Sequence, residues 1–333
     1  FLYDSDFPSG QLQLISMSSI DFAIGNGPSY LPSISADGSK IAFVSEASNL
    51  TSNDPDTIAD IFVYDTNTFT LQLVSLSSGR TKSNGPSTNP VISGDGRYVA
   101  FQSQATNLLP QGQDTNGVAD IFVHDLVTGQ TVRVSLDTAG NEVFGASFEP
   151  SISYNGQVVT FSSLANDMVP GDTNGLADVF AYNRLTGSIK RVSVDSNGNE
   201  AQGRSDLSQV ADSGQAVVFR SSAANLAADD FNSVGDIFWH NLFSGETRRV
   251  SLAFDGAESN GGVGAPDVSA DGRLITFDSS ANNLVPNDNN GFLDVFIREE
   301  DFPSKSFRYT AEEVPPNTTV VGSVESETAV QWY

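Results

Sequence analysis

The chain has 333 residues, and its 41 acidic against 16 basic residues give a formal net charge of −25. This excess argues against nucleic-acid binding, because phosphate backbones are held by basic patches. Hydrophobic residues make up 38 % and charged residues only 17 %, which predicts a folded protein with a core rather than a disordered polyanion. Cysteine is absent, which excludes disulfides, thiolate metal sites and thiol nucleophiles.

Targeting signals are absent from the sequence as given. No run approaches the roughly 18 consecutive apolar residues of a membrane span. The chain begins at Phe1 rather than at Met, which we interpret as a processed or trimmed piece of a larger protein. The lack of a signal peptide is therefore no argument against secretion.

A repeat organises almost the whole chain. An Asp-Ile-Phe or Asp-Val-Phe triplet occurs five times, spaced by 60 residues once and by 58 residues three times. Each copy also has a two-residue turn, such as Asp37-Gly38, followed by a segment in which an aliphatic residue alternates with Phe, such as Ile41 and Phe43. Alternation with period two predicts strands with one large and one small face, as in a sheet packed between two others.

Each repeat contains four predicted strands. The alternating segment is followed by a polar loop, the triplet strand, a turn such as Thr128-Gly129, and a last strand that ends in Val-Ser. Hairpin-sized connections join these strands, and no long apolar pattern has the 3.6-residue period of a helix. Four antiparallel strands in each of several repeats predict an all-β fold, a β-propeller.

The two ends of the chain are predicted to share one blade. Residues 1–16 match the outer half of a repeat, and residues 318–333 match a degraded inner half. With five full repeats over about residues 30–310, this predicts a six-bladed β-propeller forming a single domain over residues 1–333. A five-bladed ring with two unpaired tails is the alternative.

The repeats resemble those of TolB-like β-propellers. The likeness is carried by Ser-Ala-Asp-Gly-Arg-Leu-Ile-Thr-Phe at 269–277 and Asp-Ile-Phe-Val-His-Asp at 120–125, and it recurs in five copies. The resemblance implies a propeller fold. Similar repeats occur in periplasmic protein-binding propellers, in peptidase propellers and in polysaccharide-degrading enzymes, so function must be argued from a site. This chain departs from the pattern in a longer loop between the second and third strands.

The longer loop has a motif of its own, Asp-x-(Asn/Asp)-(Gly/Ser/Thr)-x-x-Asp. Oxygen-bearing side chains at alternate positions before a turn are suited to a hard cation, and Ca²⁺ takes about six to eight oxygen ligands. The candidate metal ligands are Asp54, Asp56, Asp60, Asp114, Asn116, Asp120, Asp172, Asn174, Asp178, Asp230, Asn232, Asp236, Asp288, Asn290 and Asp294. Without the helices and the bidentate Glu of an EF-hand, a site here would be open, with a Kd of roughly 10⁻⁴ to 10⁻³ M.

Turn formation is the competing interpretation of this motif. Asp and Asn side chains accept hydrogen bonds from backbone amides a few residues on, which stabilises turns without any ion. A few residues before the loops stand five asparagines that we expect to brace them: Asn49, Asn107, Asn166, Asn225 and Asn283. Propeller topology predicts that all five loops lie on one face, beside the connections between blades.

Catalytic residues are not evident in the sequence. His124 and His240 are the only histidines, and both occupy the same position of the repeat, where we expect amphipathic strand residues. No Gly-x-Ser-x-Gly elbow is present. Arg204 and Arg220 interrupt the pattern within one repeat and form a candidate ligand-binding spot for a carboxylate or uronate. Unpatterned surface variation is the alternative.

Repetition of the acidic loop favours a binding or scaffold protein over an enzyme. Near-equivalent loops suit multivalent or ion binding better than a single catalytic centre. We therefore predict a secreted, cell-surface or periplasmic bacterial propeller, a monomeric domain of a larger protein, with Ca²⁺ as the candidate ion. Its partner would be a protein or a polysaccharide on the acidic-loop face. The alternatives are an enzyme, a lyase or hydrolase acting on polysaccharides or peptides, and a structural spacer in an adhesin.

Overall fold

The computed structural model describes residues 2–3, 12–232 and 234–300. Strands make up the regular structure of these residues, and none of their segments is a helix long and apolar enough to cross a membrane. Five sheets follow one another along the chain, each a blade with its strands in chain order.

The first four blades have four antiparallel strands each, and the fifth has three in the described residues. Blade 1 comprises β3 (Ser29–Ile34), β4 (Lys40–Ser45), β5 (Asp60–Asp65) and β6 (Thr70–Leu73). Blade 2 comprises β7 (Ser87–Ile92), β8 (Tyr98–Ser103), β9 (Asp120–Asp125) and β10 (Thr131–Arg133). Blade 3 comprises β11 (Ser147–Ile152), β12 (Val158–Ser163), β13 (Asp178–Asn183) and β14 (Ser188–Arg191). Blade 4 comprises β15 (Ser205–Val210), β16 (Ala216–Ser221), β17 (Asp236–Asn241) and β18 (Thr247–Arg249). Blade 5 comprises β19 (Asp267–Val268), β20 (Leu274–Ser279) and β21 (Asp294–Glu299).

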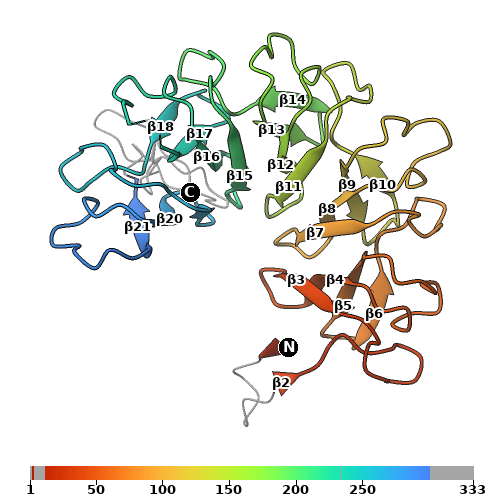
Figure 1. Cartoon of the computed structure of the whole chain (residues 1–333). Helices are drawn as coiled ribbons and strands as arrows, with labels where there is room; N and C mark the ends of the chain where they lie inside the picture. Colours follow the sequence, from red (N-terminus) through yellow and green to blue (C-terminus); the bar gives the residue numbers. More distant parts are fainter. Residues whose placement is uncertain (1, 4–11, 233, 301–333) are drawn as a thin grey trace, which may run out of the picture.

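The blades are arranged around a common axis, with the first strand of each blade turned inward (Figure 1). This confirms the predicted all-β propeller. A short antiparallel pair, β1 (Leu2–Tyr3) and β2 (Leu12–Gln13), precedes blade 1. The predicted sixth blade, built from residues 1–16 and 318–333, lies mostly outside the described residues. Val295 of β21 is 80 % exposed, whereas its counterpart Ile61 in blade 1 is fully buried between blades.

The hydrophobic core is divided into layers between neighbouring blades. One layer joins Ile121 and Val123 of blade 2 to Val159 and Phe161 of blade 3, and the other blade pairs repeat this arrangement. Within each blade, the Phe residues of the second and third strands pair, with ring centroids 5.8–6.2 Å apart. The predicted alternation of large and small residues therefore fills the space between twisted sheets, as interior packing density requires.

The crossover between blades needs glycine at one position. A Cβ atom on Gly145 would lie 2.3 Å from the backbone nitrogen of Ala165, at the end of the second strand. The equivalent glycines of the other crossovers make the same close approach to backbone atoms: Gly27, Gly85, Gly203 and Gly261. Side chains larger than hydrogen would push the crossover off the blade.

The innermost strands carry a repeated backbone distortion. The pairing of the first with the second strand shifts register after Tyr30, Thr88, Phe148 and Asp206. The next residue in each blade has a left-handed backbone, with φ between 50° and 55°: Leu31, Asn89, Glu149 and Leu207. Three of the four precede proline, whose ring normally restricts the preceding residue to extended conformations. The bulge therefore holds strained residues on the inner wall of the ring.

Candidate functional site: four buried acidic pockets and an axial cavity

The last aspartate of each acidic loop is the buried anchor of the loop. Asp60, Asp120, Asp178 and Asp236 begin the third strand of their blades and are fully buried. Oδ1 of Asp120 accepts a hydrogen bond from Ser135 Oγ at 2.6 Å, and the other three aspartates accept from the equivalent serine. The Val-Ser that ends each repeat thus binds the loop to the outermost strand.

The middle residue of the motif forms the turn. Asn116 Oδ1 accepts a hydrogen bond from the backbone amide of Val118 at 3.0 Å, and its Nδ2 donates to Asp120 Oδ2 at 3.2 Å. The middle residues of the other loops accept the same turn hydrogen bond: Asp56, Asn174, Asn232 and Asn290. The side-chain oxygen of this residue therefore stabilises the turn, which is the alternative to metal binding that the sequence suggested.

The first aspartate of the motif has at least one buried carboxylate oxygen that accepts no hydrogen bond in four of the loops. Asp54 is 1 % exposed, and neither of its carboxylate oxygens accepts a hydrogen bond from a described residue. One oxygen of each equivalent aspartate is buried in the same way: Asp114, Asp172 and Asp230. Buried polar atoms are nearly always paired, so four equivalent exceptions in one protein call for an explanation.

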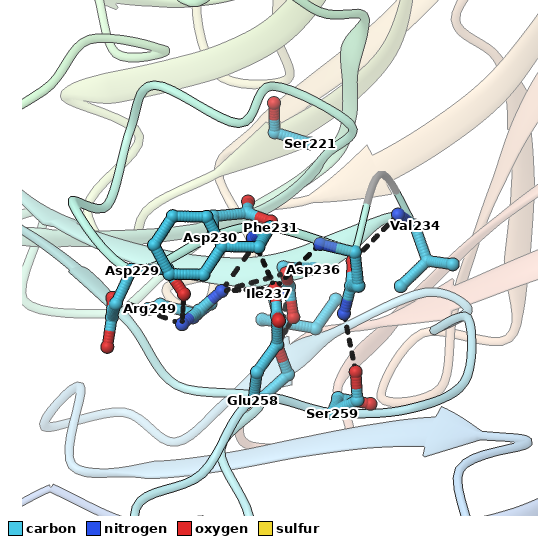
Figure 2. A network of polar contacts seen from close by, with 12 residues as sticks. Ser221, Asp229, Asp230, Phe231, Val234, Asp236, Ile237, Arg249, Glu258 and Ser259 are labelled. Atoms are coloured by element: carbon cyan, nitrogen blue, oxygen red, sulfur yellow. Dashed lines mark hydrogen bonds and ion pairs between the residues drawn. The ribbon is translucent and has the colours of Figure 1, made fainter.

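A basic side chain enters each pocket from elsewhere in the blade. In blades 2 to 4 it is the arginine that ends the outermost strand: Arg133, Arg191 and Arg249. Arg191 Nη1 lies 2.6 Å from Glu200 Oε1 but 3.8 and 3.7 Å from Asp172 and Asp178. The guanidinium is therefore bound mainly to the glutamate. Figure 2 shows the pocket of blade 4, where Arg249 Nη1 lies 3.3 Å from Glu258, 3.5 Å from Asp236 and 3.7 Å from Asp230. The exposed Asp229 also contacts this guanidinium.

The glutamates come from the crossover to the next blade. Glu142, Glu200 and Glu258 join their loops through backbone amides, as where Thr115 N donates to Glu142 Oε1 at 2.8 Å. Each pocket thus connects the acidic loop, the outermost strand and the crossover. Neither the arginines nor these glutamates were identified from the sequence, although both recur at fixed offsets in three repeats.

Blade 1 builds its pocket from different residues. Leu73 stands at the position of Arg133, and Lys82 stands at the position of Glu142. Lys82 Nζ lies 2.7 Å from Asp60, 2.9 Å from Asp56 and 3.5 Å from Asp54. Compared with blades 2 to 4, the cation of blade 1 comes from the crossover instead of the outermost strand. Its third carboxylate comes from the loop instead of the crossover.

Burial shapes the ionisation of these groups. Burial, and next the charge of the facing Asp60, raises the pKa of Asp54 to about 6. The same causes raise the pKa of Asp114 and Asp230 to about 6 and that of Asp172 to about 7. By contrast, hydrogen bonds from Thr115 and Arg133 outweigh burial and lower the pKa of Glu142 to about 2. The first aspartate is thus the least stabilised anion of the pocket.

The fifth loop is more exposed than the other four. Asp288 and Asp294 are only half-buried, and Asn290 makes the turn and donates to Asp294 Oδ2 at 2.8 Å. Among the residues that the structure describes, no basic side chain contacts these two aspartates. Four of the five predicted loops therefore form complete pockets.

The predicted bracing asparagines bind the crossovers. Asn107 Oδ1 accepts from the amide of Asn84 at 3.0 Å, and its Nδ2 donates to the carbonyl of Lys82 at 2.8 Å. Asn49, Asn225 and Asn283 make the same two contacts. In blade 3 the prediction named the wrong residue, because Asp167 rather than Asn166 occupies this position and accepts from Phe144.

The two histidines are strand residues, as predicted, and both are buried. Nδ1 of His124 and of His240 lies 2.8 Å from the hydroxyl of Thr131 and Thr247, respectively. Burial lowers the pKa of both imidazoles to about 4, which keeps them neutral. Blades 1 and 3 replace this His-Thr pair by Tyr with Leu or Ile.

Arg204 and Arg220 lie together, held by a carboxylate that the sequence analysis did not identify. Asp206 is 3 % exposed and accepts from Arg204 Nε at 2.6 Å and from Arg220 Nε at 2.9 Å. The Arg204 guanidinium also lies over the ring of Phe148 in blade 3, 5.7 Å from its centroid. The predicted cationic spot is thus half neutralised, and a buried anion fixes the orientation of both guanidinium groups.

The left-handed residues of the inner strands surround a cavity of about 630 Å³ on the axis. Leu31, Asn89, Glu149 and Leu207 all line it, with a proline after the first three. Glu149 Oε2 accepts from the amide of Leu207 at 3.2 Å, which connects the cavity wall to the neighbouring Asp206 cluster. The backbone of these positions is the same in four blades, whereas the side chains are apolar, amide and acidic.

Comparison with known proteins gives matches to solved structures only. No protein-family model and no curated protein matches the sequence. Among solved structures, oligogalacturonate lyase from Vibrio parahaemolyticus aligns at a TM-score of 0.50 and 13 % identity, over 88 % of this chain and 70 % of that one. TolB from Acinetobacter baumannii aligns at a TM-score of 0.46 and 17 % identity, over 83 % of this chain and 55 % of that one. A putative TolB from Agrobacterium tumefaciens aligns at 0.46 and 13 %, over 83 % and 91 %.

These identities show a shared fold and nothing about shared chemistry. The chain has the β-propeller fold.

Proposed function

We propose that this propeller is a non-catalytic binding module, exported to the periplasm, the cell surface or the medium, that holds its ligand in the axial cavity. The observation that carries the proposal is the repeated left-handed residue on the inner wall. A non-glycine residue in this conformation costs roughly 1–2 kcal/mol, and such strain tends to cluster where a site needs it. The backbone of this position is constant and its side chain varies, which is the pattern of a binding surface on a rigid scaffold.

The chemistry of the wall favours a polymer segment with apolar and polar groups. Leu31, Leu207 and the prolines supply apolar surface, while Asn89 and Glu149 supply an amide and a carboxylate. The adjacent guanidinium groups of Arg204 and Arg220 would suit an acidic group of the same ligand. A peptide or an acidic glycan chain fits this description.

Arrays of peptides and glycans, probed with the labelled protein, test the proposal. A ligand that binds the wild type, is lost with Leu207→Ser and is kept with Leu185→Ser would support it. Leu185 is 78 % exposed and lies in the β13–β14 turn, away from the cavity wall, so its replacement is a matched control. Ligands that bind both variants equally, or chemical turnover of a bound ligand, would contradict it.

A further inference from the structure

The four acidic pockets have the same formal charge, although the pocket of blade 1 is built from different residues than the other three. Each contains three carboxylates whose ligand atoms lie within 4.8 Å of one another, together with one basic side chain. Each set therefore carries a formal charge of −2. Blade 1 differs from blade 2 at three positions of the pocket, where Asp56, Leu73 and Lys82 replace Asn116, Arg133 and Glu142. Three simultaneous differences leave the charge unchanged.

A residual charge of −2 is costly in a pocket of this depth. The side chains of Asp54 and Asp172 are each only 1 % exposed, and both last aspartates of these loops are fully buried. Burying ionised carboxylates without full compensation costs several kcal/mol per ion. A structural role alone would be served better by a second cation or by fewer acids, and none of these four pockets adopts that solution.

We propose that each of the four pockets binds one Ca²⁺ ion between its first and last aspartates. Asp54, Asp114, Asp172 and Asp230 each have a buried carboxylate oxygen that accepts no hydrogen bond from a described residue, and their ion pairs with the basic side chains are long, at 3.5–3.8 Å where they form. These oxygens offer the ligand atoms. Two ligands at the Ca²⁺–oxygen distance of about 2.4 Å are at most about 4.8 Å apart, which the three carboxylates satisfy. All the donors are oxygen atoms, which favours Ca²⁺ over zinc or copper.

In blades 2 to 4 the basic side chain would stay in the pocket as the partner of the crossover carboxylate, whereas in blade 1 Lys82 would keep its contact with Asp56, 2.9 Å from Nζ, and release Asp60 to the ion. Arg191 Nη1 is bonded to Glu200 at 2.6 Å, and its Nη2 donates to the carbonyl of Gly171 at 3.1 Å. Its contacts with Asp172 and Asp178 exceed 3.6 Å, so in blade 3 the aspartate pair is the part of the pocket that remains open to a cation. In blade 2 Arg133 donates to Asp120 Oδ2 at 3.2 Å and would have to release this contact to an ion. The ion would then join the start and the end of one loop, which are otherwise linked through the turn.

Calcium bound per chain, measured by equilibrium dialysis of the whole chain, tests the proposal. We expect binding with a Kd of roughly 10⁻⁴ to 10⁻³ M in about 150 mM KCl, which screens nonspecific attraction to the acidic surface. Asp172→Asn should lower the bound calcium by one ion per chain, because it keeps the shape of the side chain and removes one ligand charge. Asp114→Asn should do the same through blade 2.

Asp167→Asn is the matched control. It removes a carboxylate from the same blade as Asp172, lies outside the pocket, and restores the asparagine found in the other blades. Its bound calcium should equal that of the wild type. Equal losses in Asp167→Asn and Asp172→Asn, or no rise in the melting temperature between EDTA and millimolar Ca²⁺, would overturn the proposal, because an ion bound to the native state must stabilise it.

Discussion

Lys82 Nζ, in the crossover after blade 1, lies 2.7 Å from Asp60 Oδ2. In the equivalent pocket of blade 2 the cation is Arg133, which comes from the outermost strand and lies 3.2 Å from Asp120 Oδ2. The same electrostatic environment is thus reached twice with the charges exchanged between positions. Such an exchange within one chain indicates that the pocket, rather than any single residue of it, is what the fold maintains.

Removing the basic group of blade 1 should destabilise the protein strongly. Lys82→Met leaves the buried Asp54 and Asp60 and the half-exposed Asp56 without a cation, and breaking a buried pair in this way costs about 3–5 kcal/mol. The free energy of unfolding, measured by urea denaturation in EDTA, should fall by about this amount, and Ca²⁺ should recover part of it. Lys40→Met is the control, because Lys40 and Asp65 form a more exposed pair that contributes at most about 1 kcal/mol. Equal effects of the two substitutions would contradict this account of the pocket.

Transferring the charge pattern of blade 2 into blade 1 should restore stability. Lys82→Glu alone adds a fourth carboxylate and should prevent folding or lower stability severely. The combination of Lys82→Glu with Leu73→Arg and Asp56→Asn reproduces blade 2 and should unfold within about 1 kcal/mol of the wild type, since coupled sites are not additive. A triple variant no more stable than Lys82→Glu would show that the three positions are independent.

The buried histidines should make stability fall as the pH drops. Burial holds the folded pKa of His124 and His240 at about 4, below the ordinary value of 6.5. The unfolded state therefore binds more protons between about pH 6.5 and 4, so each histidine contributes stability that is present above this window and lost below it, roughly 3 kcal/mol. Replacing His124 and Thr131 by the Tyr and Leu of blade 1 should flatten the urea-derived stability profile over this window. An unchanged profile would mean that His124 titrates normally in the folded protein.

Relieving strain on the axial wall should cost little stability. Leu31 has a φ of 52° and is 47 % exposed. Leu31→Gly removes about 1–2 kcal/mol of strain and adds about 0.5–1 kcal/mol of unfolded-state entropy, so the melting temperature should stay the same or rise slightly. A fall of more than about 4 °C would show that this leucine is kept for stability rather than for a ligand.

The cluster around Asp206 should depend on its carboxylate. Asp206→Asn leaves Arg204 and Arg220 without their shared anion, which should lower the free energy of unfolding by roughly 1–3 kcal/mol. Arg204→Ala removes only a half-exposed partner and should cost less than about 1 kcal/mol. Thermal denaturation of the two variants gives the comparison, and an equal loss would place the stabilising contact in Arg204 instead.

Much of the fold could be predicted from the sequence, because the five copies of the repeat can be aligned with one another. Period-two alternation identified the second strand of each blade, and the Gly turns and the Asp-(Ile/Val)-Phe triplet identified its hairpins. The bulge at Leu31 could not be predicted, since residues before proline ordinarily adopt extended conformations.

The site could be predicted only in part. The acidic motif was visible, but Arg133 and Glu142 lie 13 and 22 residues beyond Asp120 and come from a strand and a crossover that the motif does not include. Their signal was the joint replacement of both positions in the first repeat. Arg204 and Arg220 were visible as departures from the pattern, whereas Asp206 was hidden because acidic residues are abundant throughout the chain.

A crystal structure of the protein grown with millimolar CaCl₂, with anomalous diffraction data, tests the central claim about the acidic pockets most directly. We expect anomalous density about 2.3–2.6 Å from the facing oxygens of Asp172 and Asp178, and at the equivalent place in blades 1, 2 and 4. Pockets without such density, in which Arg191 Nη1 is hydrogen-bonded directly to both aspartates, would contradict it.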